Sequence, residues 1–328
     1  MTIPAAYCLD LAFGDPILAW HPVRIIGKLI EGLETRLNSA RDIGKKSNKV
    51  FSGAILVILV VGITIFFVAG ILSLAKRIHP ALFYILSVLF IYFALSVKDL
   101  ALQANKVKQA LMDKNIPEAR NRLSMLVGRD TERLDEPEII RASVETVAES
   151  IMDGIVAPLC YVFLGGPILI WAYKAVNTLD SMVGYRSERF IEFGKAAAWL
   201  DGLANFIPAR ITCLLIILSG WVARGKYARN AFKWGWRYFL RGSQVNSEAT
   251  EAAMAGALGV RLGGVNFYHT IPVSKPLIGD DYERLEIKHI QESIRIAYVC
   301  SLLSILFGVF LLYPAPLIRC GIYLTGRR

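Results

Sequence analysis

Residues 51–75 (FSGAILVILVVGITIFFVAGILSLA) form an uninterrupted run without a single charged side chain. About 20 apolar residues are enough for a helix to cross the roughly 30 Å of hydrocarbon in a bilayer. Residues 296–318 form a second run of this kind, and residues 80–97 form a third, slightly shorter one. The whole chain, with 55% hydrophobic residues, is also more apolar than a soluble domain. The sequence therefore predicts an integral membrane protein and excludes a soluble enzyme.

Two further apolar segments, residues 155–173 and 206–223, contain residues that interrupt a membrane helix. The interruptions are Pro158, Gly165, Gly166 and Pro167 in the first segment and Pro208 and Arg210 in the second. If all five segments cross, residues 174–205 lie opposite the other large polar blocks, although they carry four Lys or Arg residues. Alternatively, both interrupted segments are re-entrant or line a polar cavity, where irregular backbone is tolerated at membrane depth. We favour the second arrangement by a small margin, and both remain open.

The polar blocks between these segments have helical spacing, and neither a convincing strand pattern nor an internal repeat is visible. We therefore predict an all-α, polytopic integral membrane protein with about five apolar segments, two of them broken and re-entrant or cavity-lining. Helical soluble loops join these segments. Residues 1–328 are expected to form a single membrane-embedded domain that crosses the cell membrane several times.

The net charge of +10 raises the question of nucleic-acid binding. Residues 202–247 contain no Asp or Glu, and basic residues directly follow the second interrupted segment: Arg224, Lys226, Arg229, Lys233, Arg237 and Arg241. Aromatic residues alternate with them, as expected of a belt beside anionic lipid at the cytoplasmic surface. We therefore expect the lipid bilayer, and no nucleic acid, as the partner. The belt could also attract an anionic substrate, and the sequence does not separate these roles.

Metal and nucleotide motifs are scarce. The five cysteines and four histidines show no CxxC, HExxH or HxH spacing, so any metal should be bound by oxygen atoms. No GxxxxGK[ST] motif is present. The glycines of GALGVRLGG (256–264) could bring backbone amides near a phosphate, but close packing of helices explains them better.

A ladder of acidic residues follows the polar stretch GRDTERLDEPE (128–138). At helical spacing, one face carries Glu138, Arg141, Glu145, Glu149 and Asp153, and the next residues begin an apolar segment. Mg²⁺ needs only one or two carboxylates in addition to water and substrate phosphate. The ladder is therefore either a magnesium and substrate site at the membrane edge or a solvated face whose arginine pairs with its neighbours. Taken alone, the ladder supports both interpretations equally.

A second polar cluster, NTLDSMVGYRSER (177–189), lies just beyond the apolar segment 155–173. Its candidate side chains are Asn177, Asp180, Tyr185 and Arg186. Ionisable groups near the hydrocarbon edge are costly and are functional candidates for that reason.

Four stretches of the chain together resemble one family. They are LDLAFGDP…HPVRIIG (9–27), GRDTERLDEPEIIRASVETVAESIMDGIVAPL (128–159), YKAVNTLDSMVGYRSERFIEFGKAAAWLDGLANFIPAR (173–210) and EAAMAGALGVRLGG (251–264). Their order and length are similar to those of the adenosylcobinamide-phosphate synthase family of cobalamin biosynthesis, over nearly the whole chain. The segment NSEATEA (246–252) departs from the family pattern, because Glu248 and Thr250 stand where a glycine and a proline are usual.

The resemblance implies a membrane-bound, amide-forming ligase. Such an enzyme joins adenosylcobyric acid to (R)-1-amino-2-propanol or its O-phosphate, with ATP as co-substrate and Mg²⁺ as cofactor. The expected partners are the corrinoid, the amino alcohol and the bilayer, and a complex with other late corrin-pathway enzymes stays open. A transporter or a scaffold for those enzymes is the alternative, suggested by the interrupted segments and by Arg210.

Carried over onto this chain, the resemblance implies the following site. Catalytic residues are Glu145, Glu149, Asp153 and Asp180, of which Glu149 and Asp153 also bind the metal. Substrate-binding residues are Arg129, Asn177, Tyr185, Arg186, Asn205 and Glu251. The arginines are expected to bind phosphate, and the asparagines to orient the substrate.

Overall fold

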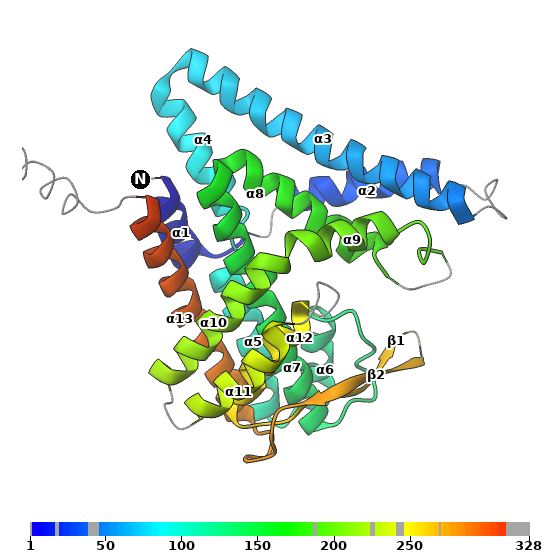
Figure 1. Cartoon of the computed structure of the whole chain (residues 1–328), viewed down its shortest axis with the longest axis vertical. Helices are drawn as coiled ribbons and strands as arrows, with labels where there is room; N and C mark the ends of the chain where they lie inside the picture. The colour runs from blue at the N-terminus through cyan, green and yellow to red at the C-terminus, as the bar shows by residue number, and fades with distance from the viewer. Residues whose placement is uncertain are drawn as a thin grey trace, which may run out of the picture.

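The computed structural model describes residues 2–16, 20–38, 46–185, 189–223, 227–240, 246–268 and 270–312. The elements in chain order are α1 (Thr2–Phe13), α2 (Pro22–Leu37), α3 (Lys46–Ile78), α4 (Pro80–Tyr92), α5 (Val97–Met112), α6 (Ile116–Ser124), α7 (Glu136–Ile151), a π-helix (Met152–Val156), α8 (Ala157–Val183), α9 (Lys195–Ala204), α10 (Phe206–Ala223), α11 (Ala228–Phe239), α12 (Asn246–Leu258), β1 (Leu262–Tyr268), β2 (Ile271–Ile278) and α13 (Ile287–Leu312). Figure 1 shows α3 and α4 as a long hairpin at one end and the two strands with α11 at the other.

The prediction of a polytopic helical membrane protein is confirmed. Within the described part of the chain, four helical stretches are long and apolar enough to cross a membrane: Asn48–Ile78, Pro80–Met112, Glu136–Val183 and Ile287–Leu311. A bent pair, Lys195–Ala204 with Phe206–Val222, makes a fifth, and the angle between its two helices is 48°. The acidic ladder and the apolar segment after it therefore belong to one helical stretch.

The two interrupted segments differ in where they break. In α8 the backbone leaves the helical region at Gly165 and Gly166, and Gly166 has a positive φ of 65° that favours glycine. The α9–α10 bend lies at Asn205, before the second segment. Pro208 and Arg210 were predicted to break that segment, but both lie inside the continuous α10. Pro208 is tolerated because the first helical turn has no partner for a backbone N–H.

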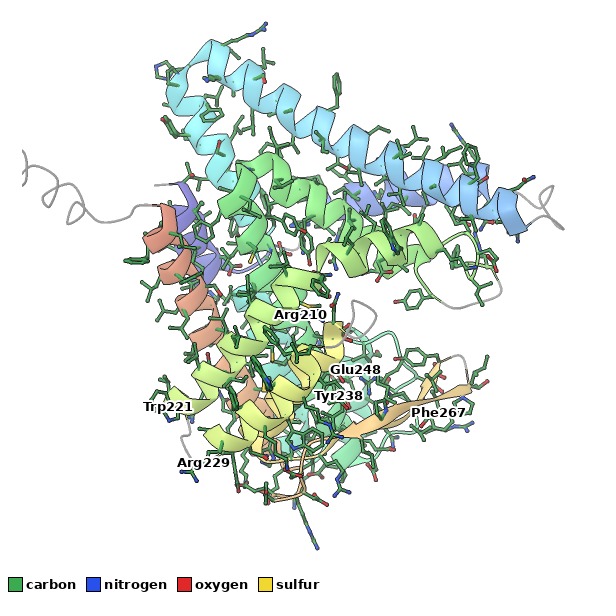
Figure 2. The ribbon with its side chains drawn as sticks, viewed as in Figure 1. Arg210, Trp221, Arg229, Tyr238, Glu248 and Phe267 are labelled. Carbon is green, nitrogen blue, oxygen red and sulfur yellow. The ribbon has the colours of Figure 1, made fainter. Side chains whose placement is uncertain are left out.

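Arg210 is buried and forms contacts between helices. Its guanidinium donates hydrogen bonds to Asn246 Oδ1 at 2.5 Å and to the carbonyl of Phe239 at 3.1 Å, and it also lies 4.0 Å from the ring of Phe206. The side chain thus connects α10 with α11 and α12, and Figure 2 shows it between these elements.

An antiparallel hairpin of β1 and β2 was not revealed by the sequence pattern. Its alternation is reversed: Asn266 is buried, whereas Val265 and Phe267 on either side of it are 49% and 45% exposed. The alternation of apolar residues therefore does not mark the buried face of β1. Asn266 points inward because Arg129 and Arg141 donate to its side-chain oxygen.

The N-terminal motif LDLAFGDP (9–16) positions the start of α5. The Asp10 carboxylate is buried and accepts hydrogen bonds from the backbone N–H groups of Val97 (3.0 Å) and Lys98 (3.4 Å). The next turn is held by Tyr92, whose hydroxyl donates to the carbonyl of Gly14 at 2.5 Å. These contacts fix the first turn of α5, which carries Asp99 into the wall of a polar cavity of about 450 Å³.

Candidate functional site

The acidic ladder divides into three parts with different surroundings. Glu138 closes a capping box with Asp135 at the start of α7, with reciprocal bonds of 2.9 and 3.0 Å. Glu145 is buried, with a relative exposure of 1%. Glu149 and Asp153 line the cavities described below. Neither a uniform solvated face nor a uniform metal site describes the ladder.

Glu145 binds the side chains that attach the hairpin to α7. Its carboxylate lies 2.7 Å from Arg129 and 3.4 Å from Arg141, and it accepts a 2.8 Å hydrogen bond from the backbone N–H of Gly263. Arg141 also donates to the carbonyl groups of Gly263 and Val265. The predicted catalytic role of Glu145 stays a prediction, and these contacts favour an anchoring role.

Asp153 lies on the π-helical turn between α7 and α8. Such turns insert an extra residue and are frequent at functional sites. Gly154 accepts hydrogen bonds from the backbone N–H and the hydroxyl of Ser96, both at 3.2 Å. A Cβ atom at Gly154 would lie 2.5 Å from that hydroxyl, so the contact requires glycine.

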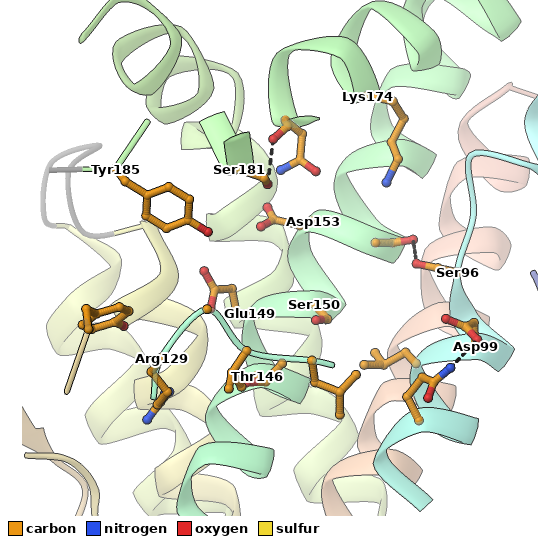
Figure 3. Close-up of a pocket in the computed structure, with 18 of the residues that line it drawn as sticks. Ser96, Asp99, Arg129, Thr146, Glu149, Ser150, Asp153, Lys174, Ser181 and Tyr185 are labelled. Atoms are coloured by element: carbon orange, nitrogen blue, oxygen red, sulfur yellow. Dashed lines mark hydrogen bonds between the residues drawn. The ribbon is translucent and has the colours of Figure 1, made fainter. Parts of the chain in front are cut away.

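Two polar cavities meet at Glu149, Asp153 and Tyr185, which line both of them. We call the smaller, of about 450 Å³, the Lys174 cavity, and the larger, of about 810 Å³, the Trp199 cavity. Figure 3 shows Glu149, Asp153 and Tyr185 directed toward one another, with Lys174 reaching in from α8. The protein can therefore hold two ligand groups on either side of one pair of carboxylates.

The wall of the Trp199 cavity is strongly acidic. Asp153 interacts electrostatically with Asp201, Glu149 and Asp180, and Lys174 is the one cation among the groups that act most strongly on it. The glycine of the VGYR sequence makes room for one of these acids, because a Cβ at Gly184 would lie 2.0 Å from Asp180 Oδ1. Carboxylates at this density attract a cation, either a metal ion or a protonated amine.

A hydrogen-bonded chain supports this acidic wall from behind. Tyr173 lies 3.0 Å from Asn205 Oδ1 and 3.4 Å from Asp153 Oδ1, so its hydroxyl can donate to either. Asn205 donates to Asp201 at 3.0 Å, and Asn177 also hydrogen-bonds to Asp201. The two asparagines predicted from the sequence thus converge on an aspartate that was not predicted.

The other residues predicted from the sequence lie at different places around the two cavities. Tyr185 is half-exposed at the shared wall, where burial raises the pKa of its phenol. Glu251 is fully buried on α12, and Lys275 lies 3.1 Å from it. Burial raises the pKa of Glu251 to about 7, although Lys275 acts in the opposite direction. Arg186 lies outside the described residues.

Sequence reasoning missed Lys174, Asp201 and Tyr173 as members of the site. Helical spacing alone could have found two of them, because Lys174 precedes Asn177 by one turn and Asp201 precedes Asn205 by one turn. Tyr173 carried no such signal, because its ring lies in an apolar segment and stacks on Tyr161 with the ring centroids 4.8 Å apart.

The acidic wall fits a hydrated magnesium ion better than a metal held by protein ligands alone. Among the residues that the structure describes, no three His, Cys, Asp or Glu side chains are grouped so that they could hold one metal ion. Mg²⁺ usually keeps several waters and takes one or two carboxylates plus substrate phosphates. Glu149 and Asp153 at the junction of two cavities meet that smaller requirement.

Known proteins of similar sequence identify the family of this chain. The family model described as CobD/Cbib protein matches residues 3–297. Relatives named cobalamin biosynthesis protein CobD, from Clostridium perfringens and Geobacter metallireducens, are 43% and 45% identical, over 93% and 92% of this chain and 95% and 93% of theirs. Cobalamin biosynthesis protein CbiB of Salmonella typhimurium is 42% identical, over 98% of this chain and 99% of its own. No solved structure matches. The chain belongs to the CobD/CbiB family.

Proposed function

We propose that this chain is an amide-forming ligase of cobalamin biosynthesis located in the cell membrane. It would join the carboxylate of adenosylcobyric acid to the amine of (R)-1-amino-2-propanol or its O-phosphate, with consumption of ATP. The names of the relatives support the pathway. The observation that carries the chemistry is the pair of carboxylates, Glu149 and Asp153, at the wall shared by two polar cavities.

Amide formation from a carboxylate needs an activated acyl group. In the proposed reaction a carboxylate oxygen of the corrinoid attacks the terminal phosphorus of ATP and ADP leaves, which gives an acyl phosphate. A base takes one proton from the ammonium group, the free amine nitrogen attacks the acyl carbon, and inorganic phosphate leaves with the second proton of the amine. Bound Mg²⁺ would neutralise phosphate charge during the first step.

The residues divide according to these needs. We assign Glu149 and Asp153 to Mg²⁺ and the ammonium form of the substrate. Asp180 would accept the proton, and Asn177 and Asn205 would orient the acidic wall. Tyr185 would contact substrate in both cavities, and Arg186 remains a candidate phosphate ligand. Glu251 would act through Lys275, and Arg129 would hold the hairpin that carries this lysine against the cavity.

The decisive experiment is turnover by the purified chain in lipid nanodiscs. With adenosylcobyric acid, ATP, Mg²⁺ and either amino alcohol, we expect an amide product by mass spectrometry and one ADP per product. The better of the two amines identifies the substrate. Absence of product, combined with movement of corrinoid across sealed vesicles, would contradict the ligase and favour the transporter. Absence of both would favour a scaffold for other late corrin-pathway enzymes.

We also propose that α11 binds anionic lipid. It carries Arg229, Lys233 and Arg237 and no acidic residue. Its aromatic residues stack in sequence, with centroid distances of 5.7 Å from Phe232 to Trp236 and 5.2 Å from Trp236 to Phe239. Figure 2 places Arg229 near Trp221 at one end of the molecule, where both line a cavity of about 340 Å³.

Replacing Arg229 and Arg237 together by glutamine is expected to weaken the binding of phosphatidylglycerol about thirtyfold, because each basic residue near an anionic surface contributes about 1 kcal/mol. Native mass spectrometry of protein extracted from mixed vesicles measures the retained lipid. Arg122→Gln on α6, which removes an exposed arginine paired with Glu118 at 2.6 Å, is the control and should retain lipid normally. Equal loss in both variants would contradict a site on α11.

A further inference from the structure

The ammonium group of Lys174 is not hydrogen-bonded or ion-paired to any side chain that the structure describes. Lys174 projects from α8 into the cavity that bears its name. Within the described residues its ammonium group makes neither a hydrogen bond nor an ion pair, although it interacts electrostatically with Asp153 and Asp15. Three N–H donors that face a cavity without a bonded acceptor are costly unless a ligand or water accepts from them.

The other two cations on this cavity are already bound. Arg129 contacts Glu145 and Asn266, each at 2.7 Å, and Lys275 contacts Glu251 at 3.1 Å. Lys174 is thus the cation of this cavity, among the described residues, whose donors are not committed to a protein acceptor.

Hydroxyl groups also line the Lys174 cavity. Thr146 and Ser150 lie one turn apart on α7, and Ser96 lines the cavity from the start of α5. Figure 3 shows Ser150 and Ser96 on the side of the cavity below Lys174. Hydroxyl and ammonium donors bind phosphate oxygens, and the neighbouring Glu149 and Asp153 suit the cation that accompanies a phosphate.

From these contacts we infer that the Lys174 cavity is the phosphate subsite of the enzyme. Lys174 is its main charged ligand, and the hydroxyls of Thr146 and Ser150 are its neutral donors. The inference rests on the proposed function and assigns the part of the site that holds a phosphoryl group. That group is either the terminal phosphate of ATP or the phosphate ester of the amino alcohol, because both present the same oxygen atoms.

Binding measurements in nanodiscs, without corrinoid and hence without turnover, test this subsite. Isothermal titration with ATP, with the amino alcohol phosphate and with inorganic phosphate is compared for the wild type, Lys174→Gln, Lys174→Arg and Lys76→Gln. We expect Lys174→Gln to raise the Kd of at least one phosphate compound about tenfold to a hundredfold, the effect of one charged hydrogen bond. Lys174→Arg keeps the charge and should stay within a fewfold of the wild type, and Lys76→Gln, at the exposed end of α3, should not change binding.

A second measurement requires no variant. An amine-reactive reagent is applied to the wild-type protein, and modification of each lysine is followed by mass spectrometry. The phosphate compound should protect Lys174 and leave Lys76 reactive. Protection by ATP identifies the nucleotide as the source, and protection by the amino alcohol phosphate alone identifies the ester. Unchanged affinities together with unprotected Lys174 overturn the inference even if amide is formed, whereas Lys174-dependent binding without amide overturns the proposed reaction and leaves the subsite intact.

Discussion

Asp153→Asn and Glu149→Gln are each expected to lower kcat for amide formation by a factor of at least about 10² to 10³. This is the usual cost of removing one electrostatic contact to a charged transition state in a desolvated site. Asn and Gln keep the shape and one oxygen of each side chain but lose the charge that would hold Mg²⁺ or the ammonium group. The larger effect is expected for Asp153, because the π-helical turn fixes its position and Tyr173 lies 3.4 Å from its carboxylate.

The matched control is Glu138→Gln on the same helix. Glu138 belongs to the same sequence ladder but serves the capping box at the other end of α7. It should retain turnover and lose about 1 kcal/mol of stability at most. Steady-state kinetics at saturating ATP, together with the amount of folded protein after size-exclusion chromatography, separate the two effects. A wild-type kcat in both Asp153→Asn and Glu149→Gln would show that neither carboxylate takes part in the reaction.

The membrane-spanning helices could be predicted from the sequence because membrane insertion leaves a strong signal. A helix in lipid must be apolar over its whole length, so the α3 and α13 spans were found from charge-free runs alone. The hairpin was not found because its inward residue is the polar Asn266, which is buried at 1% exposure by contacts with two distant arginines. The spacing of apolar residues predicts which face of a strand is buried against apolar neighbours. It predicts the wrong face where, as at Asn266, the buried contacts are polar.

The site was predicted only in part, because some of its contacts join residues that are far apart in the sequence. Helical spacing placed Glu145, Glu149 and Asp153 on one face, but it could not tell which carboxylate would be neutralised by arginines from a loop and a neighbouring turn. Only the fold brings Arg129 to Glu145 and leaves Glu149 at a cavity. For Asp201, the hydrogen bond from Asn205 follows from helical spacing, but the hydrogen bond from Asn177, on another helix, depends on the fold.

Glu145→Gln is expected to destabilise the protein by about 3–5 kcal/mol, the cost of breaking a buried ion pair from one side. The variant leaves Arg129 and Arg141, whose side chains are 7% and 10% exposed, without the charge that neutralises them. The hairpin should loosen first, because Glu145 also accepts from the backbone of Gly263 at the start of β1. Hydrogen exchange of residues 262–278 and thermal unfolding in nanodiscs measure these changes.

The control for this variant is Glu118→Gln, which removes the same charge from an arginine-paired glutamate on α6. That pair is more than one third exposed on both sides, so its loss should cost less than about 1 kcal/mol. The two variants together distinguish anchoring from catalysis at Glu145. An anchor predicts faster exchange in the hairpin, a lower unfolding temperature, and turnover that recovers when the assay is cooled. A catalytic carboxylate predicts a normal unfolding temperature with kcat lost at every temperature, and that result would overturn the anchoring role.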